Sequence, residues 1–398
     1  NAPVLSVPVR GRGPRAPGAD GGAPDATPGP GPDAASPDAT TPDSGEADAG
    51  VSMAGTWRVG PFGPCSTTCG TGTRTRVVEC VGPGDGRLPD SSCTDPRPDD
   101  SEACTDNSMC ACSSPACPGN VCSFTTAGEH VLAVPPGCSR VQVRAWGGGG
   151  AGGNQLAATG GGGAFATARF TVSPQGEALA VWVAQGGPNP GDGAGASYVL
   201  RGTTPLVVAG GGGGGGSDGC SGCASGGAGG AGGGPVGEDG QALITASAPY
   251  CLSATGGAGA TTNQGGAGGL WTGSAAFRCN GEAGGPDTGG SANGALNGGA
   301  CYLTRAQRWQ AGGGQGNGGG GGGGAGHFGG GGAGFIWTYC AGGGGGGSSY
   351  TDVASQDVRL EAGRRLLQGN LAESQGAGSG GMRNGPGADG RVEVVLEP

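Results

Sequence analysis

Glycine makes up 103 of the 398 residues and is concentrated in runs such as 210–216 and 318–324. Because glycine loses more backbone freedom on ordering than any other residue, such runs become ordered only when their N–H and C=O groups find partners and something restrains the unfolded chain. Six cysteines from Cys220 to Cys340 are candidates for that restraint. A polyglycine segment has no side chains and can form an extended, left-handed helix with three residues per turn, as polyproline does. The strict Gly-X-Y period of collagen is missing, so we do not expect a collagen triple helix. We therefore predict a bundle of polyglycine helices.

The cysteine content indicates an oxidising compartment. Sixteen cysteines with only two histidines favour a disulfide framework over metal sites, and we expect an exported protein, secreted or attached to a surface. No apolar run approaches the roughly 18 residues of a membrane span. The sequence begins at Asn1 without a recognisable signal segment, as expected of a mature or trimmed form. The net charge of −10 is spread along the chain, which disfavours nucleic acid as a partner.

Residues 1–54 form a segment of their own. The triplet proline–aspartate–alanine recurs at 24–26, 32–34 and 37–39, and the segment contains no aromatic residue. It cannot bury enough apolar surface to fold, so we predict a disordered linker rich in proline, alanine and aspartate. It is either a spacer that holds the ordered part away from a surface or partner, or a passive solvated tail.

A different pattern begins at Trp57 and ends at Cys110. It combines Trp57 and Phe62 with the run CSTTCGTG at 65–72, two alternating arginines, and six cysteines at Cys65, Cys69, Cys80, Cys93, Cys104 and Cys110. This order closely resembles a thrombospondin type-1 repeat, which we place at residues 55–110. The resemblance implies a thin, disulfide-rich, three-stranded module with the pairs Cys65–Cys104, Cys69–Cys110 and Cys80–Cys93.

The resemblance also implies a stack in which aromatic rings alternate with arginine guanidinium planes. Trp57, Phe62, Arg74 and Arg76 match those layers, because a flat cation packs on a ring face while its edge stays in water. Phe62 stands where the family often has a second tryptophan, which weakens the cation–π contact. Arg74 and Arg76 are either contacts for acidic glycans or proteins, or structural members of the stack, and we favour the structural role.

Residues 111–122 form a cysteine-containing junction, and strand signals follow it. Apolar alternation or short apolar runs occur at 131–134, 141–146, 166–172, 178–184, 206–209 and 391–396. Because these signals bracket the glycine-rich interior, we expect the last segment to pair with the early ones. The predicted fold class is mainly β: the small disulfide-rich three-stranded repeat, followed at 123–398 by a β-sandwich with an inserted polyglycine-helix bundle.

This second region resembles the glycine-rich extracellular domain of the anaplastic lymphoma kinase and leukocyte tyrosine kinase receptors. The similarity is carried by VPPG at 134–137, VQVRAWGGGG at 141–150, the glycines at 160–163 before Phe165, VVAG at 207–210 and DGRV at 389–392. It implies a sandwich like that of tumour necrosis factor, joined to polyglycine helices and contributing to ligand binding. It does not imply a kinase, since a kinase needs a strand lysine and this chain has none.

Catalytic motifs are weak. Residues 215–219 formally fit a nucleophile elbow around Ser217, yet they follow a glycine run instead of opening a helix. His130 and His327 are the only histidines available as bases, and we interpret both as packing or surface residues. We therefore expect no enzyme.

Metal and redox motifs are equally incomplete. The Cys220–Cys223 spacing fits a redox pair or half a zinc site, but no second half accompanies it, so structural disulfides are the better interpretation. Asp192 between two glycines resembles calcium-binding repeats without their period. We expect neither a metal nor another cofactor.

Large aromatic residues lie late in the chain, beside the glycine runs. Trp271, Trp309, Trp337 and Tyr339, with Phe335, either cap the glycine bundle or form an adhesive patch. We predict an extracellular, non-enzymatic adhesion, matrix or binding protein whose partner is a protein or a glycan. The alternative is the ligand-binding ectodomain of a receptor or lipoprotein whose anchor lies outside this segment.

Overall fold

The computed structural model describes residues 54–154, 158–217, 226–242, 254–270, 278–291, 319–336 and 340–398. These residues are mainly β-strands and extended chain. The single α-helix among them, α1 (Leu371–Ser374), has four residues, and short 3-10 turns occur at Asp90–Ser92 and Pro118–Asn120. None of the described helices is long and apolar enough to cross a membrane. The predicted linker, except for Ala54, lies outside the described residues.

The first ordered region, residues 54–110, consists of three long segments joined by two small antiparallel sheets. Its strands are β1 (Thr56–Val59), β2 (Gly70–Thr75), β3 (Val78–Val81) and β4 (Ser101–Asp106), paired β1 with β3 and β2 with β4. Strands β2 and β3 lie on one continuous middle segment, which therefore pairs with both of its neighbours. The buried apolar side chains of this region are Val78, Cys80 and Val81. So small a core requires covalent links.

The second region, from residue 121 onward, is a β-sandwich. One sheet has the order β15-β11-β10-β9-β6 and the other β16-β8-β7-β17-β5. Their strands are β5 (Val121–Phe124), β6 (Gly128–Val134), β7 (Arg140–Trp146), β8 (Phe165–Thr171), β9 (Glu177–Val183), β10 (Ser197–Arg201), β11 (Thr204–Ala209), β15 (Tyr350–Thr351), β16 (Gln356–Glu361) and β17 (Arg391–Glu397). Strand β5 begins at Val121, two residues before the start that we expected for this domain.

The sandwich core lies between the two sheets. Val143 of β7, Val181 of β9 and Val207 of β11 are fully buried in one continuous apolar cluster. Strand β17 pairs along its whole length with β7 and also with β5, so the prediction that the last segment pairs with early ones is confirmed. The chain thus leaves the sandwich after β7 and β11, passes through the glycine-rich segments, and closes the sheet with its final strand.

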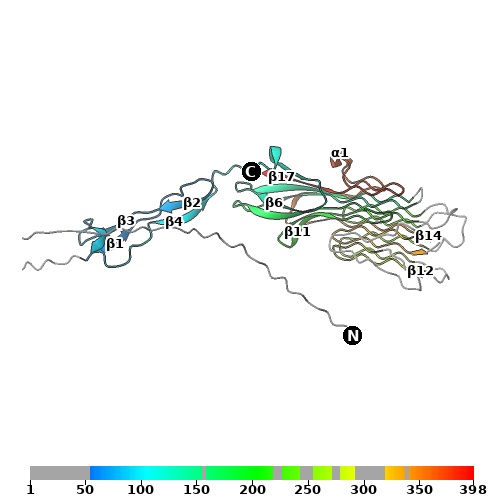
Figure 1. The fold of residues 1–398 in the computed structure, drawn as a ribbon, viewed down its shortest axis with the longest axis horizontal. Coiled ribbons are helices and arrows are strands. Elements are labelled where there is room, and N and C mark those ends of the chain that lie inside the picture. The colour runs from blue at the N-terminus through cyan, green and yellow to red at the C-terminus, as the bar shows by residue number, and fades with distance from the viewer. Residues whose placement is uncertain are drawn as a thin grey trace, which may run out of the picture. The chain divides into compact units, whose positions relative to one another are not determined.

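The glycine-rich segments continue from the sandwich as a bundle of extended threads that reach the short strands β12 (Arg278–Cys279), β13 (Phe335–Ile336) and β14 (Cys340–Ala341) (Figure 1). Residues 210–217 are all buried. Their N–H groups donate in turn to carbonyl oxygens of three neighbouring threads. Gly211 donates to Ala325 and, three residues later, Gly214 donates to Gly322 of the same thread. In the same way Gly212 and Gly215 donate to Gly148 and Ala151 of a second thread, and Gly213 and Gly216 donate to Gly230 and Gly227 of a third. A β-strand repeats every two residues, whereas this bonding repeats every three.

A hydrogen-bonding pattern that repeats every three residues is expected of a helix with three residues per turn, because its successive N–H groups point about 120° apart, toward three different neighbours. The backbone hydrogen bonds therefore satisfy the condition that the sequence sets for ordering the glycine runs. The polyproline-like helical conformation itself stays a prediction. Close packing explains why side chains are absent: a Cβ on Gly213 would lie 2.2 Å from the carbonyl oxygen of Gly344. The proposed restraint by Cys220–Cys340 falls on side chains outside the described residues.

Candidate binding sites

The first candidate site is a stack of arginines on Phe62. The guanidinium carbons of Arg74 and Arg76 lie 5.1 Å and 4.4 Å from the centre of the Phe62 ring. Arg74 belongs to β2 and Arg76 follows it by two residues, so both side chains leave the same side of an extended segment. The layered contact that the family resemblance implies is therefore present at Phe62.

Both arginines of the stack also have a polar partner. Arg74 forms an ion pair with Glu102 of β4, and the Nε–H of Arg76 donates to the carbonyl oxygen of Asp99 at 2.7 Å. Trp57 is held differently, since its indole N–H donates to the carbonyl oxygen of Asp95 at 2.8 Å. The two arginines therefore contact all three segments, and whether they also bind a partner stays a prediction.

Further ion pairs lie along this region. Arg58 donates to Glu79 at 2.7 Å, and this hydrogen bond holds the pKa of the Glu79 carboxyl below its usual range. Arg97 pairs with Asp100 at 2.8 Å. These pairs are exposed and contribute little to stability, but they neutralise the cations with neighbouring carboxylates. The arginines of residues 54–110 therefore form no continuous patch of unpaired positive charge.

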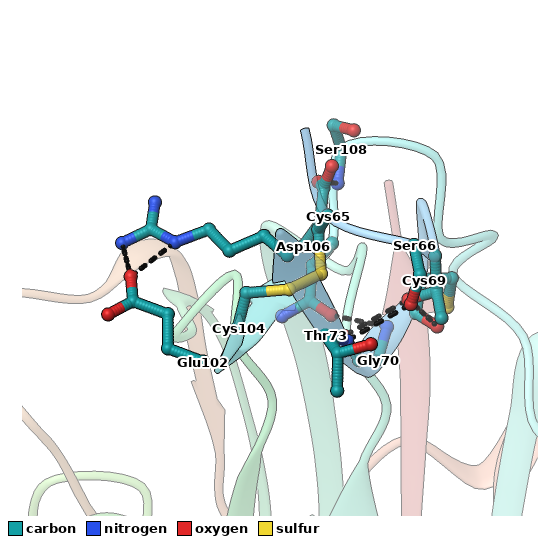
Figure 2. The surroundings of a disulfide bond; sticks show 12 residues. Cys65, Ser66, Cys69, Gly70, Thr73, Glu102, Cys104, Asp106 and Ser108 are labelled. Carbon is teal, nitrogen blue, oxygen red and sulfur yellow. Dashed lines mark hydrogen bonds and ion pairs between the residues drawn. A yellow bond between two sulfur atoms is a disulfide. The ribbon is translucent and has the colours of Figure 1, made fainter. Parts of the chain in front are cut away.

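Three disulfides cross-link the same segments: Cys65–Cys104, Cys69–Cys110 and Cys80–Cys93. They are the three pairs that the family resemblance implies. Figure 2 shows Cys104 of β4 bridged to Cys65, with Glu102 two residues away on the same strand. Nearby, the hydroxyl of Ser66 accepts from the N–H of Thr73 at 3.0 Å, which fastens the segment before β2 to β2 itself.

Two more disulfides lie at the junction, Cys112–Cys138 and Cys117–Cys122. All four sulfur-bearing side chains are buried and belong to the apolar cluster of the sandwich. The junction is therefore covalently part of the sandwich and not a free linker. All ten cysteines with described side chains are in disulfides.

The candidate aromatic patch falls on Trp271, Trp309, Trp337 and Tyr339, which all lie outside the described residues. Among the described aromatic residues, Trp182 and Tyr198 stack in parallel with ring centres 5.9 Å apart. They pack beside the thread residue Ala325 on the outer face of the β9–β11 sheet. These rings cover the sandwich where the threads begin.

The candidate catalytic side chains are engaged in packing. Ser217 is fully buried in a thread, and its N–H donates to Gly319. His130 of β6 places Nε2 2.7 Å from the carbonyl oxygen of Thr126. His327 stacks on Tyr350 with ring centres 4.2 Å apart, and burial lowers the pKa of its imidazole.

Asp192, the candidate calcium ligand, lies in a small hydrogen-bonded loop. The carboxylate of Asp192 accepts a hydrogen bond from the side-chain amide of Asn189 at 2.8 Å and closes its own loop. In the described ranges, no group of three or more histidine, cysteine, aspartate or glutamate residues could hold a metal ion.

One surface feature was not found by the sequence reasoning. The segment 363–369 forms a tight turn that presents Arg364 and Arg365 beside a groove of about 600 Å³. The sequence signal was available, because these two residues are the one adjacent arginine pair in the chain. A pair of arginines between glycines is too common a pattern to indicate a site without the geometry.

Comparison with known proteins identifies the first region. The thrombospondin type 1 domain family matches residues 57–110. The human protein named ADAMTS-like protein 3 is 48% identical over 48 residues, which are 12% of this chain and 3% of that protein. Human "A disintegrin and metalloproteinase with thrombospondin motifs" 18 and 20 are 47% and 45% identical over 49 and 51 residues, covering 4% and 3% of their lengths.

The aligned part is thus a small fraction of each relative, and the family match at 57–110 does not reach the sandwich or the threads of this chain. Within it, the six cysteines, Phe62 and the two stacked arginines occupy the strands and bridges described above. Residues 57–110 are a thrombospondin type 1 domain.

Proposed function

We propose that the protein is an extracellular, non-enzymatic binding or matrix protein. The observation that carries this proposal is the thrombospondin type 1 domain at 57–110, whose six cysteines are all bridged. Bridges of this density are stable in oxidising compartments and are reduced in the cytosol. A module that has a small core and displays side chains on a disulfide-linked frame is suited to binding a partner.

The glycine-rich region supports the same function as a rigid platform. Its threads are joined by backbone hydrogen bonds in three directions, so the bundle has the connectivity of a solid block instead of a flexible linker. Many of its positions are glycines, which have no side chain with which to bind or react. Chemistry would have to use the few interior polar groups, and the one nucleophile candidate, Ser217, is closed off from solvent. We propose that partners bind at the edges of this block and on the thrombospondin-like domain.

The proposal is tested by coating surfaces with extracellular matrix proteins and measuring attachment of the purified, oxidised full chain. We expect saturable attachment, and a loss of the part due to the first domain in a Cys69→Ser, Cys110→Ser variant. The Val77→Ala variant is the matched control, because Val77 is 62% exposed and joins no bridge. A hydrolytic activity of the purified chain that disappears in Ser217→Ala would contradict the proposal.

A further inference from the structure

The turn at 363–369 is held rigidly by the glycine threads. Arg364 and Leu367 exchange two backbone hydrogen bonds, of 2.6 Å and 2.8 Å, across a two-residue turn. The N–H of Gly363 donates to Gly232, and the carbonyl oxygen of Leu366 accepts from Gly380 at 3.0 Å. Backbone from two other threads thus fixes the turn, so a ligand would meet a surface that is already ordered.

Arg365 occupies a strained backbone position in this turn. Its φ is 49°, in the left-handed region that glycine adopts freely and other residues adopt at a cost. In a chain where about a quarter of the residues are glycine, the strain-free residue was readily available. The arginine at this position therefore adds nothing to the fold that glycine would not give, and it places a guanidinium group on the turn.

The two guanidinium groups of the turn are unpaired, in contrast with the other arginines. Across the described residues, the arginine side chains that the structure places form a hydrogen bond or an ion pair with a carboxylate or a carbonyl oxygen, with Arg364 and Arg365 as the exceptions. Both residues are exposed. Since the protein carries a net charge of −10, two adjacent cations left free of its own carboxylates are available to an external anion.

Apolar side chains accompany the charges. The groove of about 600 Å³ runs between residues 236–238 and 362–367, and a second hollow of about 470 Å³ shares Ala362, Arg364 and Leu367 with it. Val236, Leu367 and Leu371, which line these hollows, are 50–53% exposed. The carboxylates that also line them are occupied: Glu238 accepts from the N–H of Ala231, and Glu361 pairs with Arg359.

We propose that this groove binds an extended acidic peptide segment of a partner protein, with carboxylates on Arg364 and Arg365 and apolar side chains against Leu367 and Val236. Guanidinium and carboxylate match in planar, two-point geometry, which suits a peptide carboxylate. A sulfated glycan offers the charge but no large apolar group, and it would leave the half-exposed leucine and valine uncovered. The inference deepens the proposed binding function, on which it rests, by naming a site and a ligand class.

The test uses the oxidised full chain and a fluorescein-labelled octapeptide of alternating glutamate and leucine, followed by fluorescence anisotropy. We expect Arg365→Gly to weaken binding by about tenfold or more, because a charged hydrogen-bonded contact is lost. The same variant should unfold at an equal or higher temperature, since glycine removes the strain at this φ. Arg364→Ala should weaken binding similarly, and an octapeptide with glutamine in place of glutamate should bind at least tenfold more weakly.

Arg87→Ala is the matched control, since Arg87 is 77% exposed and holds only a 3.8 Å contact with Glu79; it should leave peptide affinity unchanged. The proposal is overturned if the wild-type chain does not bind the octapeptide, or if Arg365→Gly binds it as tightly as the wild type. It is also overturned if a heparin-derived hexasaccharide displaces the peptide and depends more strongly on Arg364 and Arg365. If Arg365→Gly binds the octapeptide as tightly as the wild type while the full chain still attaches to matrix coatings, this site is overturned and the proposed function stands.

Discussion

The first domain and the glycine threads are held in their folded structures by opposite means, since neither has a large apolar core of its own. Residues 54–110 bury few apolar side chains and are held by three disulfides, by ion pairs and by arginines stacked on Phe62. The inner glycine threads, such as residues 210–217, are buried along their whole length and are joined by N–H to C=O bonds in three directions. In one region side chains hold an exposed backbone together, and in the other the backbone packs because side chains are missing.

The difference teaches where each region tolerates change. In the first domain, stability depends on a few covalent and cationic contacts, so most other positions are free to vary. In the thread bundle an added Cβ would clash with a neighbouring backbone at glycines such as Gly213 and Gly344, so these positions require glycine, whereas buried alanines such as Ala231 and Ala325 mark positions where one Cβ fits. The proposed binding function would follow the same division, since exposed side chains lie on the first domain and on turns at the bundle surface such as 363–369.

The largest effect is expected from removing a disulfide of the first domain. Replacing Cys69 and Cys110 by serine opens a bridge that spans 41 residues, which costs about 4 kcal/mol on the chain-entropy model. Hydrogen exchange measured by mass spectrometry should show residues 54–110 losing protection while the 210–217 thread keeps it. Opening the five-residue bridge Cys117–Cys122 in the same way is the control, with an expected cost of about 2 kcal/mol. Unchanged protection of β2 and β4 in the first variant would break the comparison.

A single methyl group should produce the next largest effect, in the thread bundle. In Gly213→Ala the new Cβ would lie 2.2 Å from the carbonyl oxygen of Gly344, a backbone atom that cannot rotate away. We expect a loss of about 3 kcal/mol, at the upper end for an overpacked interior. The measurement is urea unfolding, with hydrogen exchange to locate the loss. In Gly86→Ala, where no atom lies within 4 Å of the new Cβ, stability should change by less than about 0.5 kcal/mol.

The two regions also differ in how far the sequence predicts them. The first domain was predictable because cysteines and aromatic residues at fixed spacing carry its geometry. Strands β7 and β17 were predictable because Val141, Val143, Val392 and Val394 alternate with polar residues. Strand β16 was not predicted, since it is an exposed edge strand with the polar sequence QDVRLE and therefore lacks a buried face.

Within the threads, sequence reasoning stops at the class of structure. Nothing in a run of seven glycines distinguishes Gly213, which bonds to Gly230, from Gly214, which bonds to Gly322, so the partners of each amide follow only from the three-dimensional packing. The arginine turn was missed for a related reason. The turn is a candidate site because Arg365 has a positive φ and because its side chain has no partner among the described residues. Neither property can be predicted from the local sequence.

A moderate effect is expected from the aromatic layer. Phe62→Ala removes the ring that both Arg74 and Arg76 cover, and we expect the first domain to lose about 1–2 kcal/mol, at about 0.5–1 kcal/mol for each cation–π contact. Phe62→Trp should restore or exceed the wild-type stability, because tryptophan attracts cations more strongly. Hydrogen exchange of β2 and β4 measures the effect. If Phe62→Ala were no less stable than Val77→Ala, the arginine layers would not hold this domain.

The smallest expected effect is a difference between the pH ranges in which the two regions weaken. Burial lowers the pKa of His327, and the nearby Asp287 opposes this shift only in part. Below about pH 6.5, the ordinary value for histidine, the unfolded chain takes up a proton that the folded bundle does not, so bundle stability falls with decreasing pH until the folded imidazole is also protonated.

In the first domain the hydrogen bond from Arg58 lowers the pKa of Glu79, whose contribution is therefore present above about pH 4.5, the ordinary value, and lost below it. Between these limits the bundle should weaken while the first domain does not. Urea unfolding followed region by region at pH 7, 5.5 and 4 measures both. His327→Phe keeps a ring against Tyr350 and should flatten the response of the bundle between pH 7 and 5.5. If the free energy of unfolding of the bundle changes with pH in that variant as it does in the wild type, the titrating group is not His327.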